Sequence, residues 1–168
     1  LFPYTTLFDL LIAPPYSLSQ TIVGWIFAIY IMGTFSSTWM GRLADKHSRN
    51  KILWIALLIM AFGAIMTLGK PLAIKILGIS VFTFGYFGSH SLASSWVGHR
   101  ALHDKAQASS LYLFFFYTGS SIGGTGGGIF WSTFGWDGVI SIILGFLFLA
   151  LLLSIHLNKI APNITLKQ

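Results

Sequence analysis

The clearest signal in this chain is the stretch GRLADKHSRNK, residues 41–51, which lies between two long apolar runs. It holds one acid and four of the ten Lys and Arg residues, although only 8% of the chain is charged. Such a cluster is costly inside the hydrocarbon of a bilayer, so it belongs at a membrane surface. The stretch therefore predicts a short loop that joins two membrane-spanning helices.

The composition favours a membrane protein over a soluble domain. Hydrophobic residues make up 55% of the chain and aromatic residues 16%, and the mean hydropathy is +0.77. A soluble domain of 168 residues needs more charged side chains to cover its surface. The formal charge of +6, without any glutamate, favours contact with anionic lipid head groups over nucleic acid. The absence of cysteine excludes disulfides and thiolate metal sites.

Five apolar segments are near the length that crosses the hydrocarbon, about 20 residues. Residues 5–13 are too short to cross, and we interpret them as the outer end of a further helix whose start is missing. Residues 1 to about 7 resemble a translated adapter sequence, so they receive little structural weight. The predicted fold is an all-α membrane protein with five full transmembrane helices plus a partial one. The predicted spans are residues 21–40, 52–68, 72–97, 108–133 and 139–157.

The Lys and Arg residues are distributed unevenly between the two sides of this arrangement. Eight of them lie in 41–51, in 98–107 or after 157, and only Lys70 and Lys75 lie on the opposite side. Because cytoplasmic loops are enriched in Lys and Arg, the first side and the C-terminus are predicted to be cytoplasmic. We therefore expect a multi-pass protein of the inner (plasma) membrane.

The spacing within residues 41–51 resembles the signature loop of the major facilitator superfamily. That pattern is Gly, three residues, Asp, Arg or Lys, one residue, Gly, one residue and two basic residues. Ser48 stands where the second glycine is usual, and Asn50 replaces one basic residue. A basic loop that sets topology without any gating role is the alternative. The resemblance implies a conformational latch formed by Gly41, Asp45, Lys46, Arg49 and Lys51.

Each part of this pattern has a physical reason. Glycine lets neighbouring helices approach closely, so Gly41 is expected at a helix contact. Asp45 can accept hydrogen bonds from the N-terminus of a facing helix. The basic residues hold the loop at the anionic leaflet of the membrane.

The resemblance extends over residues 17–157, which are similar to the last five helices of a twelve-helix transporter. The similarity is to bacterial sugar-efflux or drug-efflux proton antiporters. It implies that residues 1–168 are the C-terminal six-helix bundle of such a protein. The implied partner is the N-terminal half of the same transporter, absent from this chain, with the substrate site between the halves. The implied function is proton-coupled efflux of a small solute by alternating access, without a cofactor.

His90 is the only histidine predicted deep within a span. Thr83, Tyr86, His90 and Ser94 recur at spacings of three and four residues, so they share one helix face. An ionisable side chain at that depth is expensive and normally faces a cavity or a partner. Histidine also changes charge near neutral pH. His90 is therefore a candidate for substrate contact or proton relay, and the alternative is a hydrogen bond that packs it against a neighbouring helix.

Further polar residues are candidates for the transport pathway. Tyr117, Ser121 and Thr125 recur every four residues and form a second polar stripe. Asp9 lies on the partial helix, where a carboxylate could couple transport to protons, but an outer-surface location is an equal alternative. The predicted substrate or proton pathway comprises Asp9, Tyr30, Tyr86, His90, Ser94, Tyr117 and Ser121.

Glycines recur every four residues within 119–128. A phosphate-binding loop would need a following lysine, which this segment lacks, whereas small residues at this spacing let helices pack closely. The rival function is a small five-span membrane subunit that self-associates through this helix. The predicted packing residues are Gly119, Gly123, Gly124, Gly127 and Gly128.

His99, His103 and Asp104 have a spacing that could hold a metal ion if the segment were helical. A solvated basic segment is the more common outcome for such a charged run, so we predict no metal site. No serine–histidine–acid or paired-carboxylate arrangement is present. We therefore do not expect an enzyme.

Overall fold

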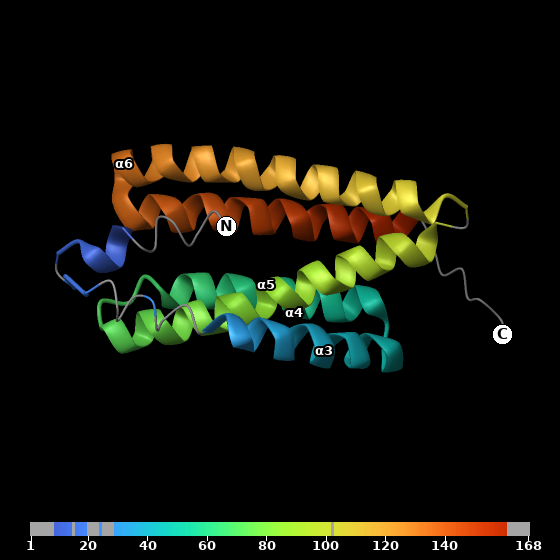
Figure 1. Ribbon diagram of the computed structural model, residues 1–168, viewed down its shortest axis with the longest axis horizontal. Coiled ribbons are helices and arrows are strands. Elements are labelled where there is room, and N and C mark those ends of the chain that lie inside the picture. The colour runs from blue at the N-terminus through green and yellow to red at the C-terminus, as the bar shows by residue number, and fades with distance from the viewer. Residues whose placement is uncertain (1–8, 15, 20–23, 25–28, 102, 161–168) are drawn as a thin grey trace.

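The computed structural model describes residues 9–14, 16–19, 24, 29–101 and 103–160, without the side chains of Tyr30 and 157–160. Its long helices run side by side as a bundle (Figure 1). All regular elements in the described ranges are helical, so the predicted all-α fold is confirmed. The long helices are α3 (Tyr30–Lys46), α4 (Arg49–Met66), α5 (Leu72–Arg100) and α6 (Lys105–Ile160).

α6 consists of two antiparallel arms. Gly135 is non-helical, with φ 62° and ψ −149°, a conformation that glycine adopts without the clash of a Cβ atom. The chain reverses there, so residues 105–134 and 136–160 lie side by side (Figure 1). The reversal lies where the sequence predicts a turn, between the expected spans 108–133 and 139–157.

Three described helices are long and apolar enough to cross a membrane: Arg49–Met66, Leu72–Arg100 and the kinked Lys105–His156. α3 has 17 residues, and most of residues 21–28 before it lie outside the described part of the chain. The described chain thus has three candidate membrane-spanning helices, and the count of five full spans stays a prediction.

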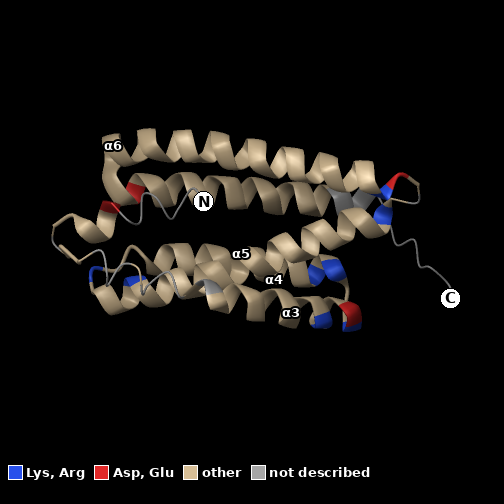
Figure 2. Cartoon of the chain, viewed as in Figure 1, with Lys and Arg blue, Asp and Glu red and all other residues tan. Residues whose placement is uncertain are grey.

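Charged residues gather at the two ends of the bundle (Figure 2). One end holds the α3–α4 and α5–α6 connections, which are the segments predicted to be cytoplasmic. The other end holds the α4–α5 connection, with Lys70, and the reversal of α6. The connections therefore group as the charge distribution predicts, and their orientation in the membrane stays a prediction.

α5 is the central helix and packs against α3, α4 and α6. Glycines bring its backbone close to both α4 and α3. A Cβ atom on Gly85 would lie 2.7 Å from the carbonyl oxygen of Ala56, and one on Gly88 would lie 2.9 Å from Ser36 Oγ. Both distances are shorter than van der Waals contact, so small residues at these positions allow the close approach of the helices.

The largest apolar core lies between α4, α5 and the second arm of α6. It joins these three elements through side chains that are almost fully buried, which stabilises the reversal of α6 against the other helices. The residues of this core are Leu57, Met60, Ala64, Phe82, Val139, Ile140, Ile143 and Leu147.

The glycine-rich first arm of α6 contributes less to the packing of the described helices than its sequence predicts. Gly123 and Gly127 are buried. A Cβ atom added to Gly119, Gly124 or Gly128 would meet no described atom within 4 Å. These three glycines therefore do not bring the described helices together, and their packing against another surface stays a prediction.

Candidate functional site

The charged stretch at residues 41–51 forms a tight helical turn and not the longer loop that the sequence predicts. α3 continues to Lys46 and α4 begins at Arg49, so only His47 and Ser48 lie between them. Charged residues can remain helical here because this end of the bundle need not enter the hydrocarbon. A Cβ atom on Gly41 would meet no described atom within 4 Å, so Gly41 makes no close contact with the described helices.

Arg49 is the centre of the contacts at this turn. Its Nη2 lies 3.4 Å from Asp45 Oδ1 and 3.3 Å from His99 Nε2, and its Nη1 donates to Ser95 Oγ at 3.2 Å. Asp45 belongs to α3, whereas Ser95 and His99 belong to the last turns of α5. Arg49 therefore ties the start of α4 to two other helices. Within the described residues Asp45 is paired with this guanidinium, and its expected contact with the N-terminus of a facing helix stays a prediction.

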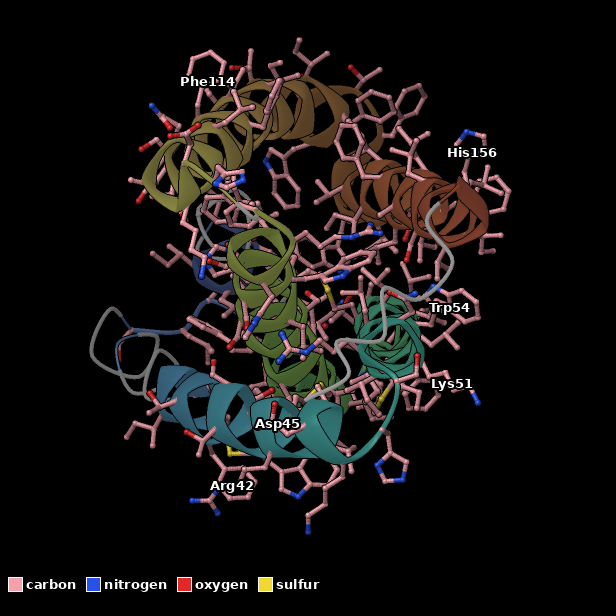
Figure 3. The ribbon with its side chains drawn as sticks, turned by 90° about the vertical axis from the view of Figure 1, so that its right-hand side faces the viewer. Arg42, Asp45, Lys51, Trp54, Phe114 and His156 are labelled. Carbon is pink, nitrogen blue, oxygen red and sulfur yellow. The ribbon has the colours of Figure 1, made fainter. Side chains whose placement is uncertain are left out.

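Lys46 and Lys51 flank the turn and are exposed. Figure 3 shows Lys51 extending away from the bundle, while Asp45 lies on α3. Exposed ammonium groups at the end of a helical bundle suit contact with anionic head groups.

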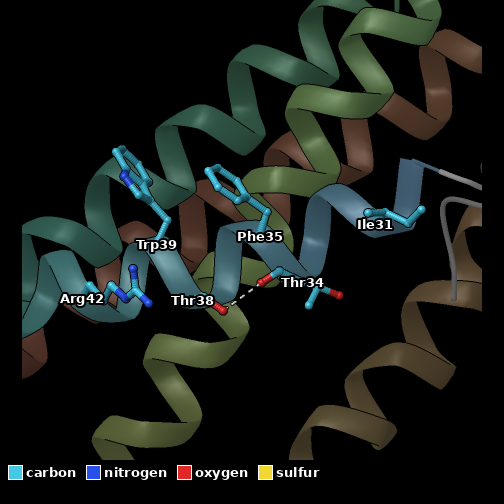
Figure 4. Close-up of a pocket in the computed structure, with 6 residues that line it drawn as sticks. All are labelled: Ile31, Thr34, Phe35, Thr38, Trp39 and Arg42. Carbon is cyan, nitrogen blue, oxygen red and sulfur yellow. Dashed lines mark hydrogen bonds between the residues drawn. The ribbon is translucent and has the colours of Figure 1, made fainter.

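A groove of about 440 Å³ lies along one face of α3 (Figure 4). Thr38 Oγ1 donates to the carbonyl oxygen of Thr34 at 3.2 Å, so this hydroxyl is satisfied within the helix. Arg42 extends away from the other helices (Figure 3). The residues predicted for the pathway or the latch do not line this groove. Its lining residues are Ile31, Thr34, Phe35, Thr38, Trp39 and Arg42.

His90 is half-buried between α5 and the first arm of α6. The hydroxyl of Tyr112 lies 2.9 Å from His90 Nδ1 and 3.3 Å from the carbonyl oxygen of His90. When the hydroxyl donates to that carbonyl, it accepts from a protonated Nδ1, and Nε2 is then the proton-accepting atom. The contact provides the hydrogen bond to a neighbouring helix expected for packing, and it leaves a ring nitrogen for proton exchange.

Aromatic rings surround the imidazole of His90. The ring of Phe116 lies 4.3 Å from it, and the ring of Tyr86 stacks at 6.4 Å with an interplanar angle of 8°. Ser94, one turn further along α5, is half-buried. The structure thus brings Tyr86 and His90 together on one face of α5, as their spacing predicts.

The other predicted pathway residues lie elsewhere in the described structure. Tyr117 is 66% exposed and Ser121 is also exposed, and neither makes a described contact with His90. Asp9 is exposed, and the adjoining Leu11 packs against Ile79, about 16 Å along α5 from His90. The side chain of Tyr30 lies outside the described part of the chain.

The sequence analysis missed Tyr112, Ser95 and the partner role of His99. Tyr112 lies four residues before Phe116, and Ser95 lies four residues before His99, so each pair shares a helix face. A search for polar and aromatic residues at this spacing on facing helices would have found both pairs.

A buried lysine at the opposite end of the bundle was also missed. Lys75 is 6% exposed, and its ammonium group donates to the carbonyl oxygen of Thr67 at the end of α4. The same group lies 5.9 Å from the ring centres of both Tyr16 and Trp136. Trp136 Nε1 donates to Thr67 Oγ1 at 3.0 Å. Lys75 therefore joins α4, α5, the reversal of α6 and the N-terminal segment.

The three residues considered for a metal site, His99, His103 and Asp104, lie in different environments. His99 contacts Arg49, while His103 and Asp104 lie in the exposed connection to α6. Within the part of the chain that the structure describes, no three His, Asp or Glu side chains are placed to hold a metal ion.

Comparison with known proteins identifies the family. The family model described as Major Facilitator Superfamily matches residues 2–163. The chain is 55% identical over 149 residues to the uncharacterized MFS-type transporter YybF of Bacillus subtilis, covering 89% of this chain and 37% of that protein. It is 41% identical over 160 residues to the inner membrane transport protein YnfM of Escherichia coli, covering 93% and 38%.

A further relative is an uncharacterized transporter of Buchnera aphidicola from Schizaphis graminum, which is 47% identical over 149 residues, or 89% of this chain and 36% of that protein. No solved structure matches the chain. The chain thus spans between a third and two fifths of the length of these relatives. The family and these relatives are transporters and not enzymes. The chain belongs to the major facilitator superfamily.

Proposed function

We propose that this chain forms the C-terminal bundle of a transporter that exports a small solute in exchange for protons by alternating access. Membership of the superfamily supports solute transport across a membrane. A second bundle would come from the remaining length of such a protein, and the substrate would bind between the two bundles. The eight-to-two distribution of Lys and Arg favours a cytoplasmic C-terminus and α3–α4 turn in the inner membrane.

The contact between His90 and Tyr112 is the observation that carries the proton-coupled part of this proposal. An ionisable imidazole within a membrane helix is costly, so its presence there favours a functional role. The ring can gain a proton at Nε2 while Nδ1 keeps its hydrogen bond to Tyr112 at 2.9 Å. Because the contact joins α5 to α6, a change in the charge of His90 would act on two helices at once.

The turn between α3 and α4 suits a latch at the cytoplasmic end. Arg49 links the turn to α5, and Lys46 and Lys51 would lie against anionic head groups. Rocking of one bundle against the other requires contacts at this end to break and re-form. Partly exposed polar contacts are suited to that role because water can replace them at low cost.

Proton coupling can be tested with the full-length transporter that contains this chain, in everted membrane vesicles. Respiration acidifies the vesicle interior, and a pH-sensitive dye reports proton release when a sugar or an amphiphilic drug is added. We expect at least one such solute to release protons. His90→Gln should abolish this release and Tyr112→Phe should shift its pH dependence.

The control is His156→Gln, which changes an exposed histidine near the end of α6 (Figure 3). It should keep the wild-type proton release. Wild-type release and pH dependence in His90→Gln would refute a coupling role for His90. Solute movement without any proton release would refute proton exchange for the transporter as a whole.

A further inference from the structure

The contact between Arg49 and His99 can be a hydrogen bond only when this histidine is neutral. Arg49 Nη2 lies 3.3 Å from His99 Nε2. A guanidinium group has donors only, so Nε2 must be the acceptor in this contact. The hydrogen bond therefore requires a neutral imidazole with its proton on Nδ1.

Protonation of His99 would turn this attraction into repulsion. The acceptor at Nε2 would become an N–H donor, and two positive charges would lie 3.3 Å apart. The other partner of Arg49 on α5 is Ser95, whose neutral hydroxyl cannot offset that repulsion. Asp45 on α3 would keep its attraction for Arg49. Arg49 would then stay with the α3–α4 turn and leave α5.

His99 and Arg49 are placed where water and protons can reach them. His99 is exposed, and the side chain of Arg49 is 30% exposed. Histidine is the side chain whose charge ordinarily changes between pH 5 and 8. The guanidinium stays charged throughout this range. The other charged or titratable side chains described on the elements at this end are Arg42, Asp45, Lys46, His47, Lys51, Arg100, His103, Asp104, Lys105 and His156.

We infer that His99 is a proton-operated release for the contact between the α3–α4 turn and the end of α5. Neutral His99 holds Arg49 against α5, and charged His99 expels it. If this end is cytoplasmic, as the proposed function has it, acidification of the cytoplasm loosens the latch. The release itself depends only on the contacts of Arg49 and not on proton coupling through His90.

The inference can be tested by distance measurements on the full-length transporter in lipid nanodiscs. Nitroxide labels on Lys51→Cys and Lys105→Cys report the separation of the turn from the α5–α6 connection; both lysines are exposed. This chain has no cysteine of its own, and cysteines elsewhere in the protein are replaced by serine. Double electron–electron resonance is recorded at several values between pH 8 and pH 5.5. The population with the longer distance should rise about tenfold, which corresponds to the loss of one hydrogen bond to a charged group.

Three variants decide whether His99 is the group responsible. His99→Gln offers Arg49 a neutral amide oxygen at every pH, so its distances should not change with pH. His99→Lys carries a permanent charge, so it should show the longer distance even at pH 8. The matched control His103→Gln removes the next histidine along the chain and should keep the wild-type response.

Two results would overturn the inference. One is a pH response in His99→Gln equal to that of the wild type, and the other is a wild-type protein whose distances do not change with pH. Because the measurement needs neither substrate nor a proton gradient, a failure here is distinct from a failure of proton-coupled export. A transporter that exports without protons could still show the release, and an antiporter could lack it.

Discussion

The two ends of the bundle place a positively charged side chain in opposite environments. At one end, Arg49 is partly exposed and shares hydrogen bonds with three exposed or partly exposed side chains. At the other end, Lys75 is 6% exposed, donates to the Thr67 carbonyl and lies between the rings of Tyr16 and Trp136. A buried ammonium without its partners is costly, whereas water replaces the partners of an exposed guanidinium easily.

This difference separates a permanent connection from one that can open. Lys75 is buried among its partners, so it connects α4, α5 and the reversal of α6. The contacts of Arg49 can break without leaving a buried charge. We therefore expect the Lys75 end to determine the stability of the bundle and the Arg49 end to determine its conformational equilibrium.

The most severe test of this comparison is Lys75→Ala. It removes the donor to the Thr67 carbonyl, both ring contacts and the buried methylene groups of the side chain. We expect a loss of about 2–4 kcal/mol in the free energy of unfolding, from the unmade hydrogen bond and the cavity. Thermal unfolding of the detergent-solubilised transporter measures it. Lys70→Ala, at the same end but exposed, is the matched control and should change little.

Equally small losses in the free energy of unfolding for Lys75→Ala and Lys70→Ala would contradict the proposed difference between the two ends of the bundle. It would mean that water replaces the contacts of Lys75 as readily as those of an exposed lysine. The difference between the two variants therefore carries more information than either value alone.

Trp136→Phe sharpens the account of the buried end. The variant keeps an aromatic ring beside Lys75 but removes the indole N–H that donates to Thr67 Oγ1 at 3.0 Å. Thr67 Oγ1 keeps its own bond to the carbonyl oxygen of Ala64. We expect a loss of about 1 kcal/mol in the free energy of unfolding, measured by the same thermal assay. A loss as large as that of Lys75→Ala would instead show that the indole, more than the ammonium, holds this end together.

The sequence predicts the helices well because apolar length and charge placement follow directly from the bilayer. The predicted spans 52–68 and 72–97 differ from α4 and α5 by at most three residues at each end. The prediction that residues 41–51 form a loop is wrong, because charged residues need not be irregular in structure. They mark only where the hydrocarbon ends, and α3 remains helical to Lys46.

The contacts between helices were harder to predict, because they depend on how each helix is rotated. The spacing of glycines predicts close packing at residues 119–128, but the close contacts of α5 occur at Gly78, Gly85 and Gly88. The same limit applies to the candidate site. His90 was found from its depth in a span, whereas Tyr112 became visible only when α6 was placed against α5.

Arg49→Lys tests the exposed end with a smaller expected effect on stability. Lysine keeps the charge but lacks the planar fork that lets Arg49 reach Asp45, Ser95 and His99 together. We expect the free energy of unfolding to change by less than about 1 kcal/mol. The longer label distance between positions 51 and 105 should be more populated than in the wild type at pH 8. Arg42→Lys, which changes an exposed arginine outside these contacts, should alter neither measurement.

Asp45→Asn should have the smallest effect on stability. Asp45 is 70% exposed and its pair with Arg49, at 3.4 Å, spans one helical turn. Such pairs contribute about 0.3–0.5 kcal/mol to the free energy of unfolding, and added salt screens them. We therefore expect a change in unfolding temperature that disappears at about 1 M salt, where the Debye length is only about 3 Å.

Because Asp45 holds Arg49 on the α3 side, its loss should leave Arg49 more firmly on α5. The wild-type rise in the longer label distance at low pH should then become smaller. An unfolding temperature lowered as far as in Lys75→Ala, at any salt concentration, would show that the exposed end is a structural connection after all.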